Sequence, residues 1–199
     1  SSEQYNFNKN FQREFDFIQA KFMAYTDSGD ITKLKDGPKI YYDSIQLSKS
    51  GKLSESLKKL NLLISRNNKD YFIVETKADI LLSYGYNKEA IKFYRKVLQY
   101  QPNNNYAKYN IFINLSLNHI DFETKKDVFL NNLNLIKYFP NNQNLLIKYH
   151  DLSKLLKNNE WILFFETLLF QKKDANQILK ELNTQTKDYN LKKIIKLYT

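Results

Sequence analysis

Residues 84–104, "YGYNKEAIKFYRKVLQYQPNN", carry the pattern from which the rest of the chain can be interpreted. Gly85 precedes a short polar run, and Ala90 and Tyr94 then follow four residues apart. That spacing places both residues on one face of a helix. Pro102 ends the pattern, because helical backbone is disfavoured in the residue before a proline. The stretch predicts an amphipathic helix that begins after a glycine turn.

The same pattern occurs 34 residues earlier (85 − 51 = 34), around Gly51. In this register small residues match small ones and apolar residues match apolar ones: Ser44 with Ala78, Leu47 with Leu81, Ser56 with Ala90, Leu60 with Tyr94, and Leu63 with Val97. This period is typical of the tetratricopeptide repeat (TPR), in which small residues let antiparallel helices approach closely; the alternative is two hairpins that share a length by chance. We therefore predict an all-α, TPR-like solenoid of antiparallel helix pairs, with an N-terminal helix packed on the first repeat and a degenerate C-terminal cap.

The remaining sequence continues this organisation less regularly, and we predict a single solenoid without an interdomain linker. Its expected parts are an N-terminal helix and connector, residues 1–36; repeat 1, 37–70; repeat 2, 71–104; a longer repeat 3, 105–141; a degenerate repeat 4, 142–173; and capping helices, 174–199. In repeat 3 the first helix is expected over residues 104–118, and His119 stands where the turn glycine would be. Asp121 is expected to cap the second helix, over residues 122–138.

An apolar stripe precedes the repeats. It consists of Phe7, Phe11, Phe15, Ile18 and Phe22, which recur at steps of four and three and so share one face of a helix. We expect this face to pack on the first repeat. The alternative is an amphipathic helix that lies on a membrane.

The composition sets the class of protein. With 4 Gly and 3 Pro in 199 residues, a many-turned β fold is disfavoured, and the absence of cysteine excludes disulfides and thiolate metal sites. The formal charge of +10 suits a nucleic-acid or anionic-membrane partner. However, the lysines are spread along the chain and rise together with Asn, Ile, Tyr and Phe, as AT-rich coding produces. Residues 161–170 form the longest apolar stretch, too short to span a bilayer. We expect a soluble chain, with no transmembrane segment and no specific nucleic-acid partner, that is whole or a piece of a longer protein.

No catalytic pattern is evident in the sequence. His119 and His150 fall in different expected helix pairs, and neither has a metal-ligand partner at helical spacing. No HExxH, phosphate-binding loop or GxSxG motif occurs. We therefore expect no catalytic residue, no metal and no cofactor in this chain, and interpret it as a binding protein.

The first helix of each repeat is expected to line a concave groove. Its predicted lining residues are Tyr41, Ile45, Phe72, Glu75, Asp79, Leu82, Tyr106, Tyr109 and Ile113. An aromatic groove with two carboxylates suits an extended or helical peptide that carries a basic residue. The alternative is that the N-terminal helix or a neighbouring repeat covers some of these rings.

One known mode of TPR binding is absent. TPR domains that grip chaperone C-terminal carboxylates resemble one another in placing Lys, Asn and Arg on this face. Here the corresponding positions hold Tyr41, Ile45, Thr76, Tyr106 and Asn110. Only the asparagine fits such a clamp.

Residues 68–104, "NKDYFIVETKADILLSYGYNKEAIKFYRKVLQYQPNN", resemble the TPR tail of BepA-type bacterial periplasmic zinc metallopeptidases, especially the alphaproteobacterial forms. The positions that match the family are Tyr71, Phe72, Glu75, Leu82, Gly85, Ala90, Ile91, Tyr94, Arg95 and Lys96. The chain departs from the family at Ala78, where a glycine is usual, and at Asp70, where a proline is usual. Residues 13–25, with Ala20-Lys21-Phe22, are similar to the helix that joins peptidase and tail. The resemblance covers roughly residues 11–140 well.

The resemblance implies a non-catalytic tail in the periplasm, whose HExxH domain would precede residue 1. Such a tail would bind protein or peptide partners, dock on its own peptidase, and position substrates in outer-membrane protein quality control. The alternative is a free-standing TPR adaptor or chaperone, for which a cytoplasmic location is equally suitable.

Overall fold

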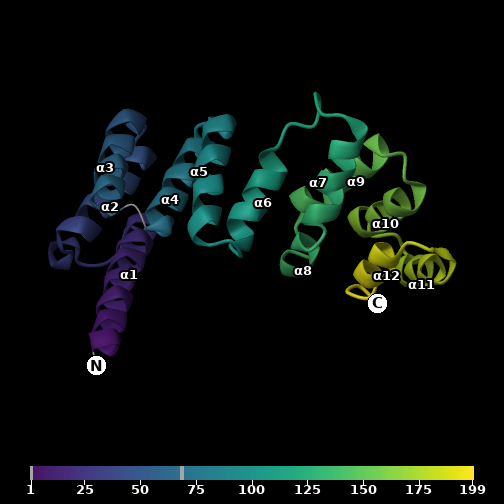
Figure 1. The fold of residues 1–199 in the computed structure, drawn as a ribbon, viewed down its shortest axis with the longest axis horizontal. Helices are drawn as coiled ribbons and strands as arrows, with labels where there is room; N and C mark the ends of the chain where they lie inside the picture. Colours follow the sequence, from purple (N-terminus) through teal and green to yellow (C-terminus); the bar gives the residue numbers. More distant parts are fainter. Residues whose placement is uncertain (1, 68–69) are drawn as a thin grey trace. The chain divides into compact units, whose positions relative to one another are not determined.

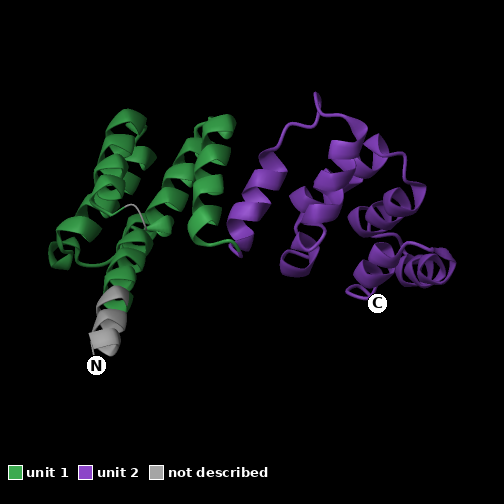
Figure 2. Cartoon of the chain, viewed as in Figure 1, with its two compact units in different colours: residues 1–102 green, residues 103–199 purple. Residues whose placement is uncertain are grey.

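A computed structural model describes residues 2–67 and 70–199, with side chains from residue 11 onward. Every regular element in these ranges is a helix, and they contain no strand (Figure 1). The all-α prediction is therefore confirmed. The chain divides into two compact units, unit 1 over residues 1–102 and unit 2 over residues 103–199 (Figure 2), whereas the sequence predicts a single solenoid.

Unit 1 begins with a long helix and continues with two helix pairs. Its elements are α1 (Ser2–Thr26), the 3-10 turn η1 (Ile31–Lys33), α2 (Asp36–Lys49), α3 (Leu53–Arg66), α4 (Tyr71–Ser83) and α5 (Asn87–Tyr100). Helices α3 and α5 begin 34 residues apart (87 − 53) and also end 34 residues apart (100 − 66). The predicted period is thus present in the helix boundaries.

The turns within the two pairs contain the same hydrogen bonds. Gly51 and Gly85 have φ of +82° and +81°, in the left-handed region that glycine occupies without steric cost. The N–H of Gly51 donates to the carbonyl of Ser48, and that of Lys52 to the carbonyl of Leu47, at 3.0 and 2.8 Å. The equivalent bonds after Gly85 are both 2.9 Å. Both helices therefore end in a Schellman motif.

The Gly85→Ala substitution is expected to lower the free energy of unfolding of unit 1 by about 1–2 kcal/mol, the cost of a Cβ at positive φ. No atom lies within 4 Å of the Cβ that alanine would add, so the effect is conformational. Urea unfolding followed by circular dichroism measures it. Gly85→Asn is the control, because asparagine tolerates this backbone better and should lose less. Equal losses in the two variants would contradict the explanation.

Small residues occupy the most buried positions of the paired helices. Ser44, Ser56, Ala78 and Ala90 each have 0% exposure. Larger buried residues surround them: Leu60, Leu63, Ile73, Ile80, Tyr94 and Val97. The predicted burial of the small residues is confirmed, and it is what allows two helix backbones to approach closely.

The helices of unit 2 have between 4 and 13 residues: α6 (Asn105–Asn114), α7 (Phe122–Asn132), α8 (Leu135–Tyr138), α9 (Gln143–Leu155), α10 (Asn159–Leu169), α11 (Ala175–Gln185) and α12 (Tyr189–Ile195). Several begin after a residue whose side chain accepts a backbone N–H: Asn104, Asp121, Asn142, Asn158 and Asp188. The predicted cap at Asp121 is confirmed, since its Oδ1 accepts from the N–H of Thr124 over 2.8 Å.

Two predicted helix boundaries in unit 2 are wrong. The first helix of repeat 3 ends at Asn114, and residues 115–121 take the place of the tight glycine turn seen in unit 1. The helix predicted over 122–138 is divided into α7 and α8. At the break the N–H of Leu133 donates to Leu130, three residues back, so the α-helical hydrogen-bond pattern is interrupted.

An aromatic cluster forms the centre of the unit 2 core. Trp161 is 1% exposed. Its ring centroid lies 5.1, 5.9 and 5.7 Å from those of Phe129, Phe164 and Phe165. The indole Nε1–H donates to Asp188 Oδ2 over 2.8 Å. One side chain on α10 thereby joins α7 to the residue that caps α12.

Candidate functional site

Helix α1 packs on α2 within unit 1 (Figure 1), through the face that carries Phe17. The Phe17 side chain is 3% exposed, and its ring centroid lies 5.5 Å from that of Tyr41 on α2 and 5.3 Å from that of Phe72 on α4. Ala20 and Ala24 on the same face are fully buried. The two small residues that follow Phe17 on this face therefore let α1 lie close to α2.

The apolar stripe predicted to pack on the first repeat faces outward instead, so that prediction is wrong. The four members with described side chains are more than half exposed: Phe11 64%, Phe15 51%, Ile18 57% and Phe22 62%. Phe7, the fifth member, lies outside the residues whose side chains the structure describes. The helix packs through its smaller residues because they permit a closer approach than four bulky side chains would.

Polar contacts hold α1 along its length. Three of them join it to α4 or to the residue before it: Arg13 with Asp70, Tyr71 OH donating to Glu14 Oε1 over 3.0 Å, and Lys21 Nζ 3.8 Å from Asp79 Oδ2. Burial, together with the Glu14 carboxylate, raises the pKa of Tyr71 to about 12. At the other end of α1, Lys49 Nζ donates to the carbonyl of Ala24 over 3.0 Å, a favourable place for a cation.

The packing of α1 covers part of the groove that the sequence predicts. Tyr41 and Ile45 are each 1% exposed and belong to the core of unit 1, so the expectation that they line an open groove is corrected. The hydroxyl of Tyr41 shares a hydrogen bond with Thr76 Oγ1 at 2.5 Å, and burial raises the pKa of Tyr41. Phe72, Glu75, Asp79 and Leu82 are half-buried on α4. Helix α1 covers the face to which Tyr41 and Phe72 contribute, which is the alternative left open from the sequence.

The three remaining groove residues belong to unit 2. Tyr109 and Ile113 pack against its core, and Tyr106 is 44% exposed. The nine predicted residues therefore fall in separate units, six in unit 1 and three in unit 2.

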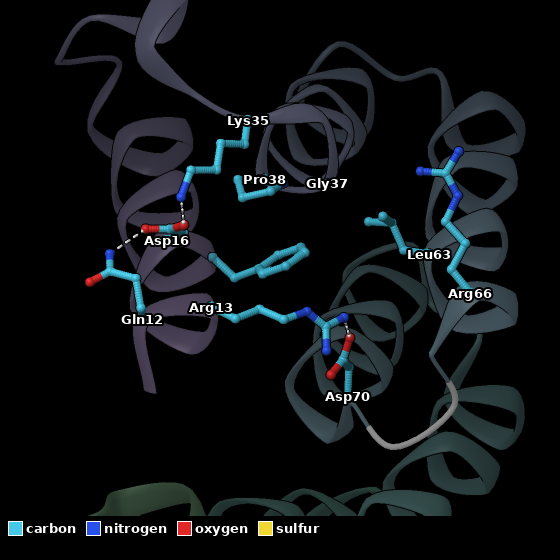
Figure 3. A pocket seen from close by; sticks show the side chains of 10 residues that line it. Gln12, Arg13, Asp16, Lys35, Gly37, Pro38, Leu63, Arg66 and Asp70 are labelled. Atoms are coloured by element: carbon cyan, nitrogen blue, oxygen red, sulfur yellow. Dashed lines mark hydrogen bonds and ion pairs between the residues drawn. The ribbon is translucent and has the colours of Figure 1, made fainter. Parts of the chain in front are cut away.

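A pocket of about 540 Å³ lies beside α1 in unit 1 (Figure 3). It is lined by Gln12, Arg13, Asp16 and Phe17 of α1, by Lys35, Gly37 and Pro38 at the start of α2, by Leu63 and Arg66 of α3, and by Asp70 before α4. Phe17, Pro38 and Leu63 are buried and form its apolar lining. The pocket thus joins an apolar interior to a charged rim.

Two ion pairs occupy part of this rim. Lys35 Nζ lies 3.0 Å from Asp16 Oδ2, while Gln12 donates to Asp16 Oδ1 over 2.8 Å. Burial favours the neutral form of Asp16, but these hydrogen bonds and the Lys35 charge prevail and lower the pKa of Asp16. On the opposite side burial raises the pKa of Asp70, and the Arg13 guanidinium offsets part of that rise.

Arg66 is the third cation of the rim and, unlike Arg13 and Lys35, it is not paired with either carboxylate of the pocket. Its side chain makes no hydrogen bond or ion pair within the described parts of the chain, and Figure 3 shows it across the pocket from α1. The rim therefore carries three cations against two carboxylates, and both carboxylates are already paired. The pocket can accept an apolar group attached to an anion, because a guanidinium binds carboxylates strongly.

The sequence did not point to this pocket, since its lining comes from four separate segments. One local signal exists at Gly37. A Cβ there would lie 3.1 Å from Phe17 Cζ, so the glycine permits the start of α2 to approach α1. A glycine before a proline at a helix start is also compatible with an ordinary turn, and the signal is therefore weak.

Lys77 is a buried cation that the sequence did not reveal. It is 9% exposed, donates to Asn61 Oδ1 over 2.6 Å, and its Nζ lies 3.9 Å from the ring centroid of Phe93. Burial, with a smaller effect from Lys96, lowers the pKa of Lys77. Its contacts hold α4 against α3 and α5, and we assign it a structural role.

The histidines form no metal site with their neighbours. His150 is 6% exposed, and its Nε2 lies 3.4 Å from Glu166 Oε1 on the adjacent helix. His119 is exposed in the connector after α6. Across residues 11–67 and 70–199, whose side chains are placed, no three His, Cys, Asp or Glu residues converge as metal ligands.

Comparison of the chain with protein-family models, curated proteins and solved structures gives no match. Within the described ranges, every helix is either too short or too polar to cross a membrane. The pocket beside α1 and the exposed stripe of α1 are the two candidate binding surfaces.

Proposed function

We propose that the chain is a TPR-like protein-interaction module that binds a peptide segment of a partner. The observation that carries this proposal is the pocket beside α1, in which an apolar lining meets Arg66, an arginine that has no hydrogen-bond or ion-pair partner among the described residues. Support for the TPR-like arrangement comes from the 34-residue helix period, the two glycine Schellman turns and the fully buried small residues of unit 1. Unit 1 already holds one helix, α1, against α2, and helical or extended peptides bind to repeat proteins through such surfaces.

The pocket determines the chemistry of the expected ligand. Phe17, Pro38 and Leu63 suit one apolar side chain, and Arg66 suits an adjacent acidic side chain or a C-terminal carboxylate. An acidic ligand differs from the basic ligand expected from the sequence. The carboxylate of Asp79, which was expected to bind a basic residue, already forms an ion pair with Lys21 and accepts a hydrogen bond from the Tyr94 hydroxyl.

Panning a phage library of random dodecapeptides against the protein tests this proposal. We expect enrichment of segments in which an acidic residue neighbours a large apolar one. Arg66→Glu should weaken the binding of an enriched peptide by about tenfold or more, the size of one charge-assisted hydrogen bond. Fluorescence anisotropy with the synthetic peptide measures the change.

Arg95→Glu is the matched control for this experiment, since Arg95 is exposed on α5 and does not line the pocket. It makes the same change in charge and should leave the affinity within about twofold. Equal losses in the two variants would show that binding follows net charge and not the pocket. Failure to enrich any peptide would contradict the proposal itself.

We further propose that this module positions substrates for a periplasmic zinc metallopeptidase. Support comes from the resemblance of residues 68–104 to the tail of that family. Among the matching residues of this chain, Tyr94 is buried in the core, and Arg95 and Lys96 are exposed. The alternative is a free-standing adaptor or chaperone. An HExxH domain and signal peptide encoded upstream of residue 1 would favour the peptidase tail, and a start codon immediately before residue 1 would favour the adaptor.

A further inference from the structure

The outward face of α1 carries a continuous apolar surface, here called the outer stripe. It consists of Phe11, Phe15, Ile18, Phe22 and Tyr25, each between 51% and 64% exposed. The members follow one another at steps of four, three, four and three, which is the a/d spacing of a coiled-coil seam. The first four members lie on the face opposite Phe17, through which α1 packs on α2, whereas Tyr25 at the end of the stripe also lines a hollow with Ile45 of α2 and Asp79 of α4.

We propose that the outer stripe pairs α1 with α1 of a second copy of this chain, in antiparallel orientation. None of the five members of the outer stripe lines the peptide pocket, although Gln12, on one border of the stripe, does. Two features of the stripe select this occupant: the area that pairing would bury, and the charges that border the stripe.

The area is sufficient for a specific pair. An aromatic side chain presents about 150–250 Å², so five members, each about half exposed, offer roughly 500 Å² per copy. A symmetric pair would bury roughly 1,000 Å², the lower limit of specific interfaces. We therefore expect a dimer that dissociates in the micromolar range and not an obligate one.

The bordering residues favour the antiparallel orientation. Glu14 and Lys21 lie on one border of the stripe, and Gln12 and Gln19 lie on the other. In the antiparallel register that places Phe15 against Ile18 of the second copy, Glu14 faces Lys21 of the second copy and Gln12 faces its Gln19. In a parallel pair Glu14 would face Gln19, and neither charge would meet its opposite.

Both charged groups remain available for this pairing. Glu14 accepts the Tyr71 hydroxyl through Oε1 only, and Lys21 lies 3.8 Å from Asp79, a long ion pair with the lysine one-third exposed. The borders carry one acid and one base and so have no net charge. A lipid surface is a poorer occupant, since helices that lie on membranes carry several basic residues along their borders.

Sedimentation velocity at chain concentrations from about 1 to 200 µM tests the pairing. The protein should pass from monomer to dimer over this range, and Ile18→Glu should raise the dissociation constant at least tenfold. Tyr189→Glu is the matched control, because Tyr189 is 74% exposed in unit 2; its association should equal that of the unmodified chain. Far-UV circular dichroism verifies that each variant keeps its helices.

Charge reversal tests the orientation. Glu14→Lys and Lys21→Glu, each alone, place like charges opposite each other in the antiparallel pair and should weaken self-association. An equimolar mixture of the two variants restores opposite charges at both contacts and should associate more tightly than either variant alone. In a parallel pair, mixing would give no such gain.

Three results would overturn the proposal. The first is a monomer at every concentration, the second is equal weakening by Ile18→Glu and Tyr189→Glu, and the third is no gain on mixing the charge variants. A monomer that floats with vesicles of phosphatidylcholine and phosphatidylglycerol, and loses this binding in Ile18→Glu, would assign the outer stripe to a membrane surface instead.

Discussion

Replacing Trp161 with alanine is expected to lower the free energy of unfolding of unit 2 by about 3–5 kcal/mol, the cost of a large cavity in a packed core. The indole contacts Phe129, Phe164 and Phe165, and its loss would also leave Asp188 without the Nε1–H donor. A loss of this size is a large part of the stability of a small domain. Thermal unfolding followed by circular dichroism measures it.

Two variants separate the contributions of Trp161. Trp161→Phe keeps most of the volume but removes the donor to Asp188, so it should lose about 1–2 kcal/mol. Phe170→Ala removes an aromatic ring that is 65% exposed just after α10, and it should change stability by less than about 0.5 kcal/mol. If Trp161→Ala were no worse than Phe170→Ala, the aromatic cluster would not be the centre of the unit 2 core.

The helix pairs of unit 1 could be predicted from the sequence because their determinants are local. Gly51 and Gly85 specify left-handed turns, and the small residues at matching positions mark where helices approach. In unit 2 the corresponding turn after α9 is made at Lys157, whose φ is +54°, with a 3.1 Å bond from Asn158 N–H to the carbonyl of Ser153. A lysine gives no sequence signal for a positive φ, so this turn could not be predicted.

The candidate site could not be predicted because it depends on which face of α1 is buried. Hydrophobicity ranks the face with Phe11, Phe15, Ile18 and Phe22 first, yet the buried face is the one with Phe17 and two alanines. The buried face is determined by the close approach of α1 to α2 and by the contacts of Arg13, Glu14 and Lys21 with residues 70–79. These are tertiary contacts, and helical periodicity alone does not contain them.

The packing of α1 on α2 and α4 through Phe17 leads to the second prediction of a large loss in stability. Phe17→Ala should remove about 3–4 kcal/mol from unit 1, since it empties the space between Tyr41 and Phe72. We expect α1 to detach before the helix pairs unfold, because the two alanines beside Phe17 contribute little apolar area of their own. Hydrogen exchange should show early loss of protection in α1 amides, with the amides of α4 and α5 still protected.

Phe15→Ala is the matched control on the same helix, two residues away. Its ring is 51% exposed on the outer stripe, so at about 1 µM, where the proposed dimer is dissociated, stability should change by less than about 0.5 kcal/mol. Trp161 is the single tryptophan and lies in the core of unit 2, so its fluorescence should be unchanged while Phe17→Ala loosens α1. Equal losses in Phe15→Ala and Phe17→Ala would mean that α1 has no preferred face. The groove of α2 and α4 would then be open, and Tyr41 and Phe72 would be accessible to a partner as the sequence first predicted.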